Sequence, residues 1–335
     1  QVNPGKTLAL VGGNVSMDRG QLTAVGGRIE LGGVAGTGTV ELSAENTGNL
    51  LSLSFPDEVA RADVSLTNQA LVNVLAGGGG SIAVNAGNIN MFARSRLAAG
   101  ISQNSGSVGA VAGDITVDAT GRVTLRESSL ISNQVDPGGT GNSGNINLLA
   151  DSLYLISGSQ LFMSTFGQGN PGSLNVNVRD IVSVDSAGNN ASTSGILNSF
   201  AGTGVGKGGD INITTGSLSV TNGAQLNAIT FGEGDAGNVT INARDAVSID
   251  GANVGASGIL SAVAPNGIGN GGNINITTGS LSVTNGAQLN AITRGQGNAG
   301  NVTINARDTV SIDGQNQNNQ AASAIFTAVG IGDDG

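Results

Sequence analysis

Residues 208–250 read GGDINITTGSLSVTNGAQLNAITFGEGDAGNVTINARDAVSID, and this text returns 63 residues later at residues 271–313. Only five positions differ: Asp210/Asn273, Phe231/Arg294, Glu233/Gln296, Asp235/Asn298 and Ala246/Thr309. The repeat has two halves, since GDINIT at Gly209 is echoed by GNVTINA at Gly237. Self-similarity at a fixed period indicates a solenoid, in which each unit buries its apolar face against its neighbours.

A short signature marks the start of each unit: a glycine, then Asn, Asp or Ser, then alternating aliphatic residues. It occurs at Gly87, Gly113, Gly144, Gly172, Gly209, Gly237, Gly272 and Gly300. The units are 26 to 37 residues long, which is too short to bury an apolar face alone. Strands from successive units that stack about 4.8 Å apart can bury it together. We therefore expect an all-β fold, a right-handed parallel β-helix with three strands per coil that forms a single elongated solenoid.

The alternation in the unit at Gly209 predicts strands at 211–213, 218–220 and 225–230, with turns at Thr215-Gly216 and Asn222-Gly223. The Asn-Gly pair suits a corner with positive φ, as does Asn285-Gly286 in the second copy. The pattern does not decide whether Ala228 or Ile229 points inward, because a bend is expected between them. The expected inward residues are Ile211, Ile213, Leu218, Val220 and Leu226, with Ile274, Ile276, Leu281, Val283 and Leu289 above them. The expected outward residues are Asn212 and Thr214, repeated as Asn275 and Thr277.

The chain divides into two parts. Residues 1–86 begin with short alternating runs between glycines and then become irregular. A charged group of Asp57, Glu58, Arg61 and Asp63 predicts a protruding loop or strand pair there, near 52–70. Residues 87–335 are predicted to be a repetitive shaft that continues beyond residue 335 in the native protein. In the shaft, short and long coils alternate. The long coils carry Gly-, Asn- and Ser-rich insertions around 186–207, 251–270 and 314–333, which we expect to stack as loops on one face, where solenoids usually bind ligands.

Composition excludes several kinds of chemistry. The 335 residues include 57 Gly but no Cys, His or Trp, so disulfides, a thiolate nucleophile and a Cys- or His-based zinc site are absent. The formal net charge is −10, and the 13 Lys and Arg residues form no cluster along the chain, which disfavours a nucleic-acid partner. No window approaches the roughly 18 apolar residues of a transmembrane segment.

One group of residues is the best candidate for catalysis: Asp118, Arg122, Arg126 and Glu127. Cleavage of a polysaccharide requires acid and base groups held a few ångströms apart, but this single loose group lacks an adjacent aromatic residue. We therefore predict no catalytic site, no metal site and no cofactor.

Other recurring polar residues are expected to be structural. Asp210, Glu233 and Asp235 become amides in the second copy, which predicts surface polar groups rather than metal ligands. Asp185, Asp250 and Asp313 end equivalent strands about 10 Å apart, too far to share an ion, and are expected to form turns. The pairs Arg179-Asp180, Arg244-Asp245 and Arg307-Asp308 predict a sparse row of exposed ion pairs.

The segments LALVGGNV (8–15) and GGRIELG (26–32), followed by the GNxxxNA coils, carry a family resemblance. The chain resembles the filamentous haemagglutinin-like exoproteins of two-partner secretion systems, most closely the long Gly/Asn-rich members found in cyanobacteria. Its first 85 or so residues look like the later part of the family's secretion (haemagglutination-activity) domain, and the remainder looks like the start of the shaft.

This resemblance implies export through an outer-membrane partner transporter, a secreted or cell-surface location, and a role in adhesion or aggregation without enzyme activity. The surface ligand is not identified by the sequence. Two alternatives are a carbohydrate-active β-helix, such as a lyase or depolymerase, and a surface-layer component.

Overall fold

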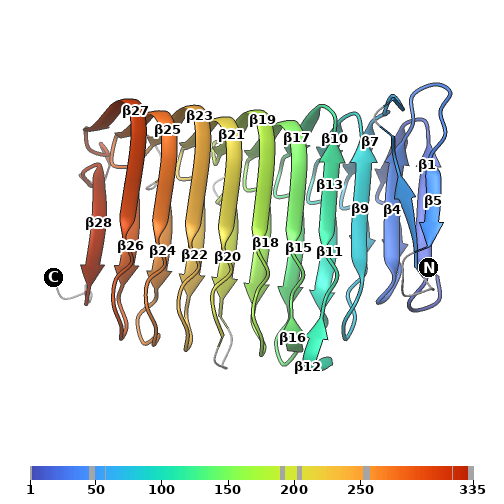
Figure 1. Ribbon diagram of the computed structural model, residues 1–335, viewed down its shortest axis with the longest axis horizontal. Helices are drawn as coiled ribbons and strands as arrows, with labels where there is room; N and C mark the ends of the chain where they lie inside the picture. Colours follow the sequence, from blue (N-terminus) through green and yellow to red (C-terminus); the bar gives the residue numbers. More distant parts are fainter. Residues whose placement is uncertain are drawn as a thin grey trace.

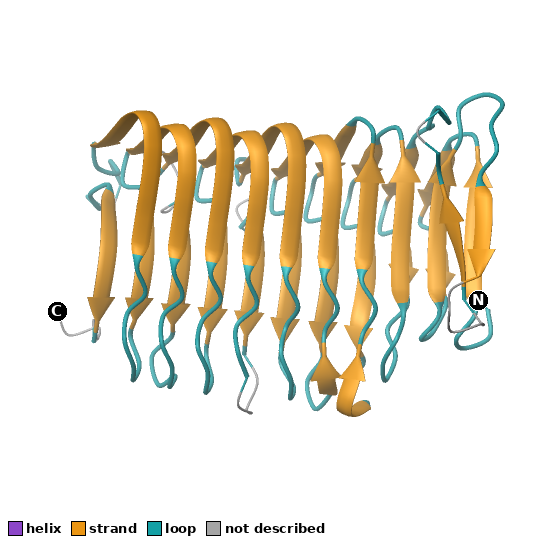
Figure 2. Cartoon of the chain, in the orientation of Figure 1, coloured by secondary structure: helices purple, strands orange, loops and turns teal. Residues whose placement is uncertain are grey.

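The computed structural model describes residues 2–44, 50–56, 58–188, 193–201, 206–251, 257–318 and 320–330. Every regular element among them is a β-strand (Figure 2). The strands stack side by side along one long axis, and the two ends of the chain lie at opposite ends of the stack (Figure 1). The all-β parallel solenoid predicted from the repeat is therefore confirmed. Asp57 and the chain end at 331–335 lie outside the described residues.

Two parallel sheets run the length of the solenoid. The first contains β1 (Thr7–Gly12), β4 (Arg28–Gly33), β9 (Ser81–Ala86), β13 (Ile115–Ala119), β17 (Ile146–Ile156), β19 (Leu174–Asp185), β21 (Ile211–Thr221), β23 (Val239–Asp250), β25 (Ile274–Thr284) and β27 (Val302–Asp313). The second contains β3 (Gln21–Thr23), β8 (Leu71–Asn73), β11 (Arg96–Ile101), β15 (Leu130–Val135), β18 (Gln160–Thr165), β20 (Gly195–Phe200), β22 (Gln225–Thr230), β24 (Gly258–Val263), β26 (Gln288–Thr293) and β28 (Ala324–Val329).

A shorter middle row completes the early coils. It consists of β2 (Val15–Asp18), β7 (Val64–Thr67), β10 (Ile89–Met91) and β14 (Arg122–Leu125), and β14 pairs with the second half of β17. Two small sheets lie outside the coils: the antiparallel pair β5 (Glu41–Ala44) and β6 (Leu51–Ser54), and the parallel pair β12 (Gly106–Val111) and β16 (Thr140–Asn142).

Three separate strands per coil occur only in the early coils. From β17 onward the first two strands run together as one long strand, so the predicted turn at Thr215-Gly216 is wrong. β21 passes through this point with a register irregularity between Thr215 and Ser217. Such an irregularity bends a strand without ending it, which keeps the apolar residues on both sides of the bend facing the interior.

The predicted core is confirmed. All ten expected inward residues are buried, with Ile211 and Ile274 completely enclosed. Ala228 is also fully buried whereas Ile229 is only partly so, because β22 runs straight through the place where a bend was expected. Burial of one such aliphatic side chain contributes about 1.5–3 kcal/mol. The Asn-Gly corners also match the prediction, with φ values of 56° and 83° at Asn222 and Gly223.

Glycine marks one corner of the coil for a steric reason. A Cβ on Gly144, Gly237 or Gly300 would overlap the carbonyl oxygen of the equivalent glycine one coil earlier. The signature at Gly87 is the exception, because Gly87 precedes β10, the second strand of its coil, and the equivalent of Gly113 is Gly80. Gly87 was misassigned because GNINMFA has the same alternation as a coil start.

The insertions of the long coils are not simply loops. The ranges 186–207, 251–270 and 314–333 contain β20, β24 and β28, which are regular strands of the second sheet. Their apolar residues, such as Ile196 and Ile259, are buried in the core, but flanking Gly, Asn and Ser concealed the strand pattern. Residues 189–192, 202–205, 252–256, 319 and 331–335 of these ranges lie outside the described residues.

Candidate functional site

A polar groove of about 590 Å³ crosses the outer face of the middle strands. Its lining comes from the chain just before β7 and from β10, β14, β17 and β19, so residues far apart in sequence meet there. The lining residues are Asp63, Asn88, Asn90, Phe92, Gly121, Arg122, Thr124, Arg126, Asp151, Ser152 and Asp180. Two of the four candidate residues, Arg122 and Arg126, therefore lie in one site.

The groove carries cations that no carboxylate neutralises. Arg122 and Arg126 are both exposed, and neither forms an ion pair with a carboxylate among the described residues. The guanidinium of Arg122 lies over the ring of Tyr154, 5.1 Å from its centroid. This cation–π contact orients Arg122 along the wall of the groove.

The three carboxylates of the groove already have partners. Asp63 accepts hydrogen bonds of 2.9 Å from both the backbone N–H and the side-chain amide of Asn88. Arg179 lies 2.9 Å from Asp151 and 3.2 Å from Asp180. Arg122 and Arg126 are therefore the charged groups whose N–H donors remain available to a ligand, although three carboxylates share the groove with them.

The sequence of the coils changes at the groove. One outward column of the middle row consists of Ser16, Ser65, Asn90, Thr124, Tyr154, Ser183, Ser219, Ser248, Ser282 and Ser311. Small serines thus occupy this column except in three consecutive coils, where Asn90 and Thr124 line the groove and Tyr154 supports Arg122. The column can be recognised in the sequence only when the coils are aligned in the correct register. Taking Gly87 as a coil start prevented this alignment, because it placed Asn90 in a first strand and not in a second one.

Asp118 does not line the groove. Its carboxylate forms a 2.9 Å ion pair with Arg61, and the backbone carbonyl of Asp118 accepts a second bond from the same guanidinium. The side chain of Arg61 is only 7% exposed and also lies 5.7 Å from the ring centroid of Phe55. Asp118 therefore anchors a segment between β6 and β7 and is unavailable for acid–base chemistry.

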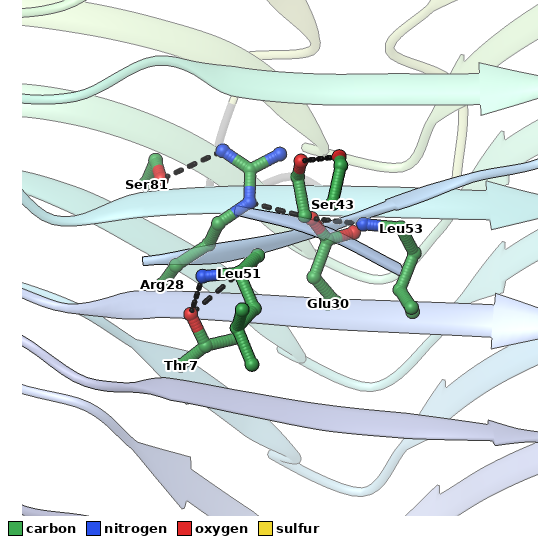
Figure 3. Close-up of polar contacts among 8 residues, drawn as sticks. Thr7, Arg28, Glu30, Ser43, Leu51, Leu53 and Ser81 are labelled. Atoms are coloured by element: carbon green, nitrogen blue, oxygen red, sulfur yellow. Dashed lines mark hydrogen bonds and ion pairs between the residues drawn. The ribbon is translucent and has the colours of Figure 1, made fainter. Parts of the chain in front are cut away.

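That segment belongs to an excursion between β4 and β7 that folds back over the outer face of the coils. Phe55 lies so close to Gly32 that a Cβ at this position would overlap the ring. The hairpin β5–β6 covers Glu30, whose carboxylate is fully buried and accepts bonds from Arg28 at 2.5 Å and from the backbone N–H of Leu53 at 3.3 Å (Figure 3). Thr7 bonds the backbone of Leu51 on the same hairpin. A protruding loop or strand pair was predicted near 52–70. The excursion does contain a strand pair, β5–β6, but it begins earlier, at Glu41, and Val64–Thr67 is a strand of the coil.

Glu127 is also separated from the groove. It lies in a second cleft of about 330 Å³, together with Arg19, Arg94 and Ser128. Glu127 has a φ of 56°, so it occupies the same kind of left-handed corner as Asn222. The four candidate residues therefore do not converge on one reaction centre.

The Arg-Asp pairs form exposed ion pairs, as predicted. The distances are 3.2 Å for Arg179–Asp180 and 2.8 Å for the two later pairs. The hydrogen bond to Asp180 and the charge of Asp151 raise the pKa of Arg179, so it stays cationic. Gly279 lies in β25, between the strands that carry Arg244 and Arg307. A Cβ at this position would overlap the backbone carbonyl of Asp245 and would lie 2.8 Å from Nη2 of Arg307.

Asp210 and Asp235 begin ladders of side-chain hydrogen bonds that run from coil to coil. The carboxylate of Asp210 accepts from the backbone N–H of Asn238 at 2.7 Å and from its amide at 3.1 Å. Asn238 in turn accepts from the backbone N–H of Asn273 at 2.9 Å. Asp235 and Asn270 repeat this arrangement at 2.8 and 3.0 Å.

The ladders explain why Asp alternates with Asn between the two copies. Asp210 is preceded one coil earlier by Ser173, which offers no amide or carboxylate oxygen, whereas Asn273 is preceded by Asn238, which does. An asparagine can accept from the next coil and also donate to the previous one, but an aspartate can only accept. Each site is thus a structural acceptor, in keeping with the prediction of surface polar groups.

Asp185 and Asp250 serve the corners. Asp185 accepts from the backbone N–H of Ala187 and from the side chain of Asn222, both at 2.8 Å, and Asp250 accepts from Asn285 at 2.9 Å. Among the described residues, no group of three or more His, Cys, Asp or Glu side chains could hold a metal ion. The part of the chain that the structure describes also contains no helix that is long and apolar enough to cross a membrane.

Comparison with known proteins gives one match. Residues 1–84 match the family model of the TPS secretion domain. No curated protein and no solved structure matches the chain. The match supports the resemblance to two-partner secretion exoproteins and implies export together with a partner transporter. It ends inside β9, the first strand of the third coil.

Proposed function

We propose that the chain is the non-enzymatic shaft of a secreted cell-surface adhesin, a filamentous haemagglutinin-like protein of the long type known from cyanobacteria. The observation that carries the proposal is the secretion-domain match at residues 1–84 on the first coils of an unbroken parallel stack. Residues 1–86 act in export and residues 87–335 form the shaft. A chain without cysteine can cross an outer-membrane transporter unfolded, and stacking outside can then proceed coil by coil.

The alternative of a carbohydrate-cleaving β-helix has less support. It requires an acid and a base within a few ångströms of one bond, whereas Asp118 is held by Arg61 and Glu127 lies in another cleft. The surface-layer alternative predicts ordered self-assembly, and no feature of the described residues specifically supports it.

Two measurements test the proposal. The chain, fused to a secretory signal peptide, is co-expressed with a two-partner transporter, and protein outside the cells is quantified with and without the transporter. Beads coated with the purified chain are then tested for adhesion to cells and polysaccharide surfaces. Transporter-dependent release and adhesion are expected; release that does not depend on the transporter, or beads that bind nothing, would refute it.

A further inference from the structure

The groove at β10, β14 and β17 is built differently from the rest of the outer surface. Its column of outward residues departs from serine only there, and its volume of about 590 Å³ lies within the range of roughly 300–1,000 Å³ that small-ligand sites occupy. Two arginines face the groove without carboxylate partners, while its three carboxylates are engaged by Asn88 and Arg179. A ligand that enters the groove would therefore meet two guanidinium groups whose N–H donors are available to an anion.

We infer that the groove binds an acidic saccharide, with Arg122 and Arg126 holding the carboxylate of a uronate residue. This inference rests on the proposed surface role and supplies its ligand class. A guanidinium binds a carboxylate through two parallel N–H···O bonds, which makes arginine suited to this recognition. The contact between Arg122 and Tyr154 holds one guanidinium in place before the ligand arrives, so less conformational entropy is lost on binding.

The remaining lining suits the hydroxyl groups of a sugar ring. Asn88, Asn90, Thr124 and Ser152 place amide and hydroxyl groups along the groove, and these can donate to or accept from sugar hydroxyls. The half-buried ring of Phe92 adds an apolar surface on the same wall.

A phosphate polymer fits less well. Nucleic-acid sites use a continuous row of cations along the backbone and several aromatic rings for base stacking. Here Asp63, Asp151 and Asp180 lie in the same groove as the two arginines, and they would repel a second and third phosphate. One or two carboxylates separated by neutral hydroxyl-bearing rings match this spacing of charge better.

The test is calorimetric titration of the full chain, at low ionic strength, with an unsulfated tetrasaccharide in which glucuronate alternates with a neutral sugar, and a neutral tetrasaccharide is the ligand control. Arg126→Gln and Arg122→Gln should each weaken binding about 10- to 100-fold, the range expected when a hydrogen-bonded charge is removed. Arg122→Lys keeps the positive charge but cannot form the two parallel N–H···O bonds of a guanidinium, so it should also weaken binding. The matched control is Arg294→Gln, an exposed arginine without an ion pair that does not line this groove and is Phe231 in the other copy.

Three results would overturn the inference. These are no binding of the glucuronate tetrasaccharide by the wild-type chain, equal affinity of the Arg126→Gln variant, and arginine-dependent binding of inorganic phosphate or a sulfated glycan but not of the glucuronate tetrasaccharide. Melting curves establish that each variant is folded. Bead adhesion distinguishes failure of this inference from failure of the proposed function. If an Arg122→Gln/Arg126→Gln protein adheres as well as wild type, the groove is not the adhesion site, but the adhesin role stands.

Discussion

The ladder that begins at Asp210 predicts that Asn238→Asp destabilises the solenoid, whereas Asp210→Asn hardly does. In the native chain the amide of Asn238 donates to the carboxylate of Asp210 at 3.1 Å. Asn238→Asp replaces this donor with an acceptor and sets two carboxylates about 3 Å apart. Asp210→Asn instead reproduces the other copy, where Asn273 accepts from the backbone and the amide of Asn301 at 2.9 and 3.3 Å.

The magnitude follows from two contributions. Two like charges at this separation repel by about 1 kcal/mol in bulk water and by about 5 kcal/mol at an effective dielectric constant of about 20. The lost hydrogen bond to a charged acceptor adds about 1.5–3 kcal/mol. Because these side chains are only partly buried and can move apart, we expect a net loss of about 2–4 kcal/mol in unfolding free energy for Asn238→Asp, against less than about 1 kcal/mol for Asp210→Asn.

Urea unfolding followed by circular dichroism measures both single variants and the Asp210→Asn/Asn238→Asp protein. The double variant should recover most of the loss, because the new amide at position 210 can donate to the new carboxylate. Like charge raises the pKa values of a carboxyl pair in the folded state, so the deficit of Asn238→Asp should be present at pH 7 and shrink as the pH falls toward 3. An Asn238→Asp variant as stable as wild type at pH 7, or a double variant no more stable than Asn238→Asp, would refute the ladder argument.

Three further predictions concern the excursion between β4 and β7, the row of Arg-Asp pairs and the left-handed corners. Arg61→Met leaves Asp118 without its ion pair and should lower stability by about 2 kcal/mol and speed hydrogen exchange in residues 41–63, measured by mass spectrometry. Gly279→Ala places a methyl group against the backbone carbonyl of Asp245, with the guanidinium of Arg307 also close, and should cost about 1–3 kcal/mol in urea unfolding, whereas Gly13→Ala, with open space around it, should cost little. Ser128→Gly relieves a φ of 60° and should raise the melting temperature, by an amount equivalent to about 1 kcal/mol; no change there would contradict the assumed strain.

The sequence predicted the core because a coil repeats the same physical environment at every level of the stack. Ile211 and Leu226 are buried for the reason their alternation suggests, and the Asn-Gly corner at 222 follows from the need for positive φ. The bend near Thr215 was not predictable in the same way. A turn and a bulged strand both interrupt alternation, and only the pairing of neighbouring coils distinguishes them.

The candidate site was predictable only in part, because proximity along a strand is a poor guide to proximity in a solenoid. Asp118 and Arg122 are four residues apart, yet Asp118 bonds Arg61 while Arg122 faces the groove. In contrast, Asp63, Arg122 and Asp180 come from separate coils and line the same groove. Arg122 and Arg126 are neighbours already in the sequence, and stacking adds residues of other coils, such as Asn90 and Ser152, to the same groove.

The ion pair between Arg61 and Asp118 also bears on which part of the chain folds as a unit. The secretion-domain match ends at residue 84, but Arg61 lies within it and Asp118 lies beyond it, on β13. β9, where the match ends, has its other edge paired with β13. A fragment that stops at residue 84 would therefore lose the partner of a nearly buried arginine and expose one edge of its last strand, both of which are destabilising. The amino-terminal coils therefore need at least the fourth coil to reach their full stability.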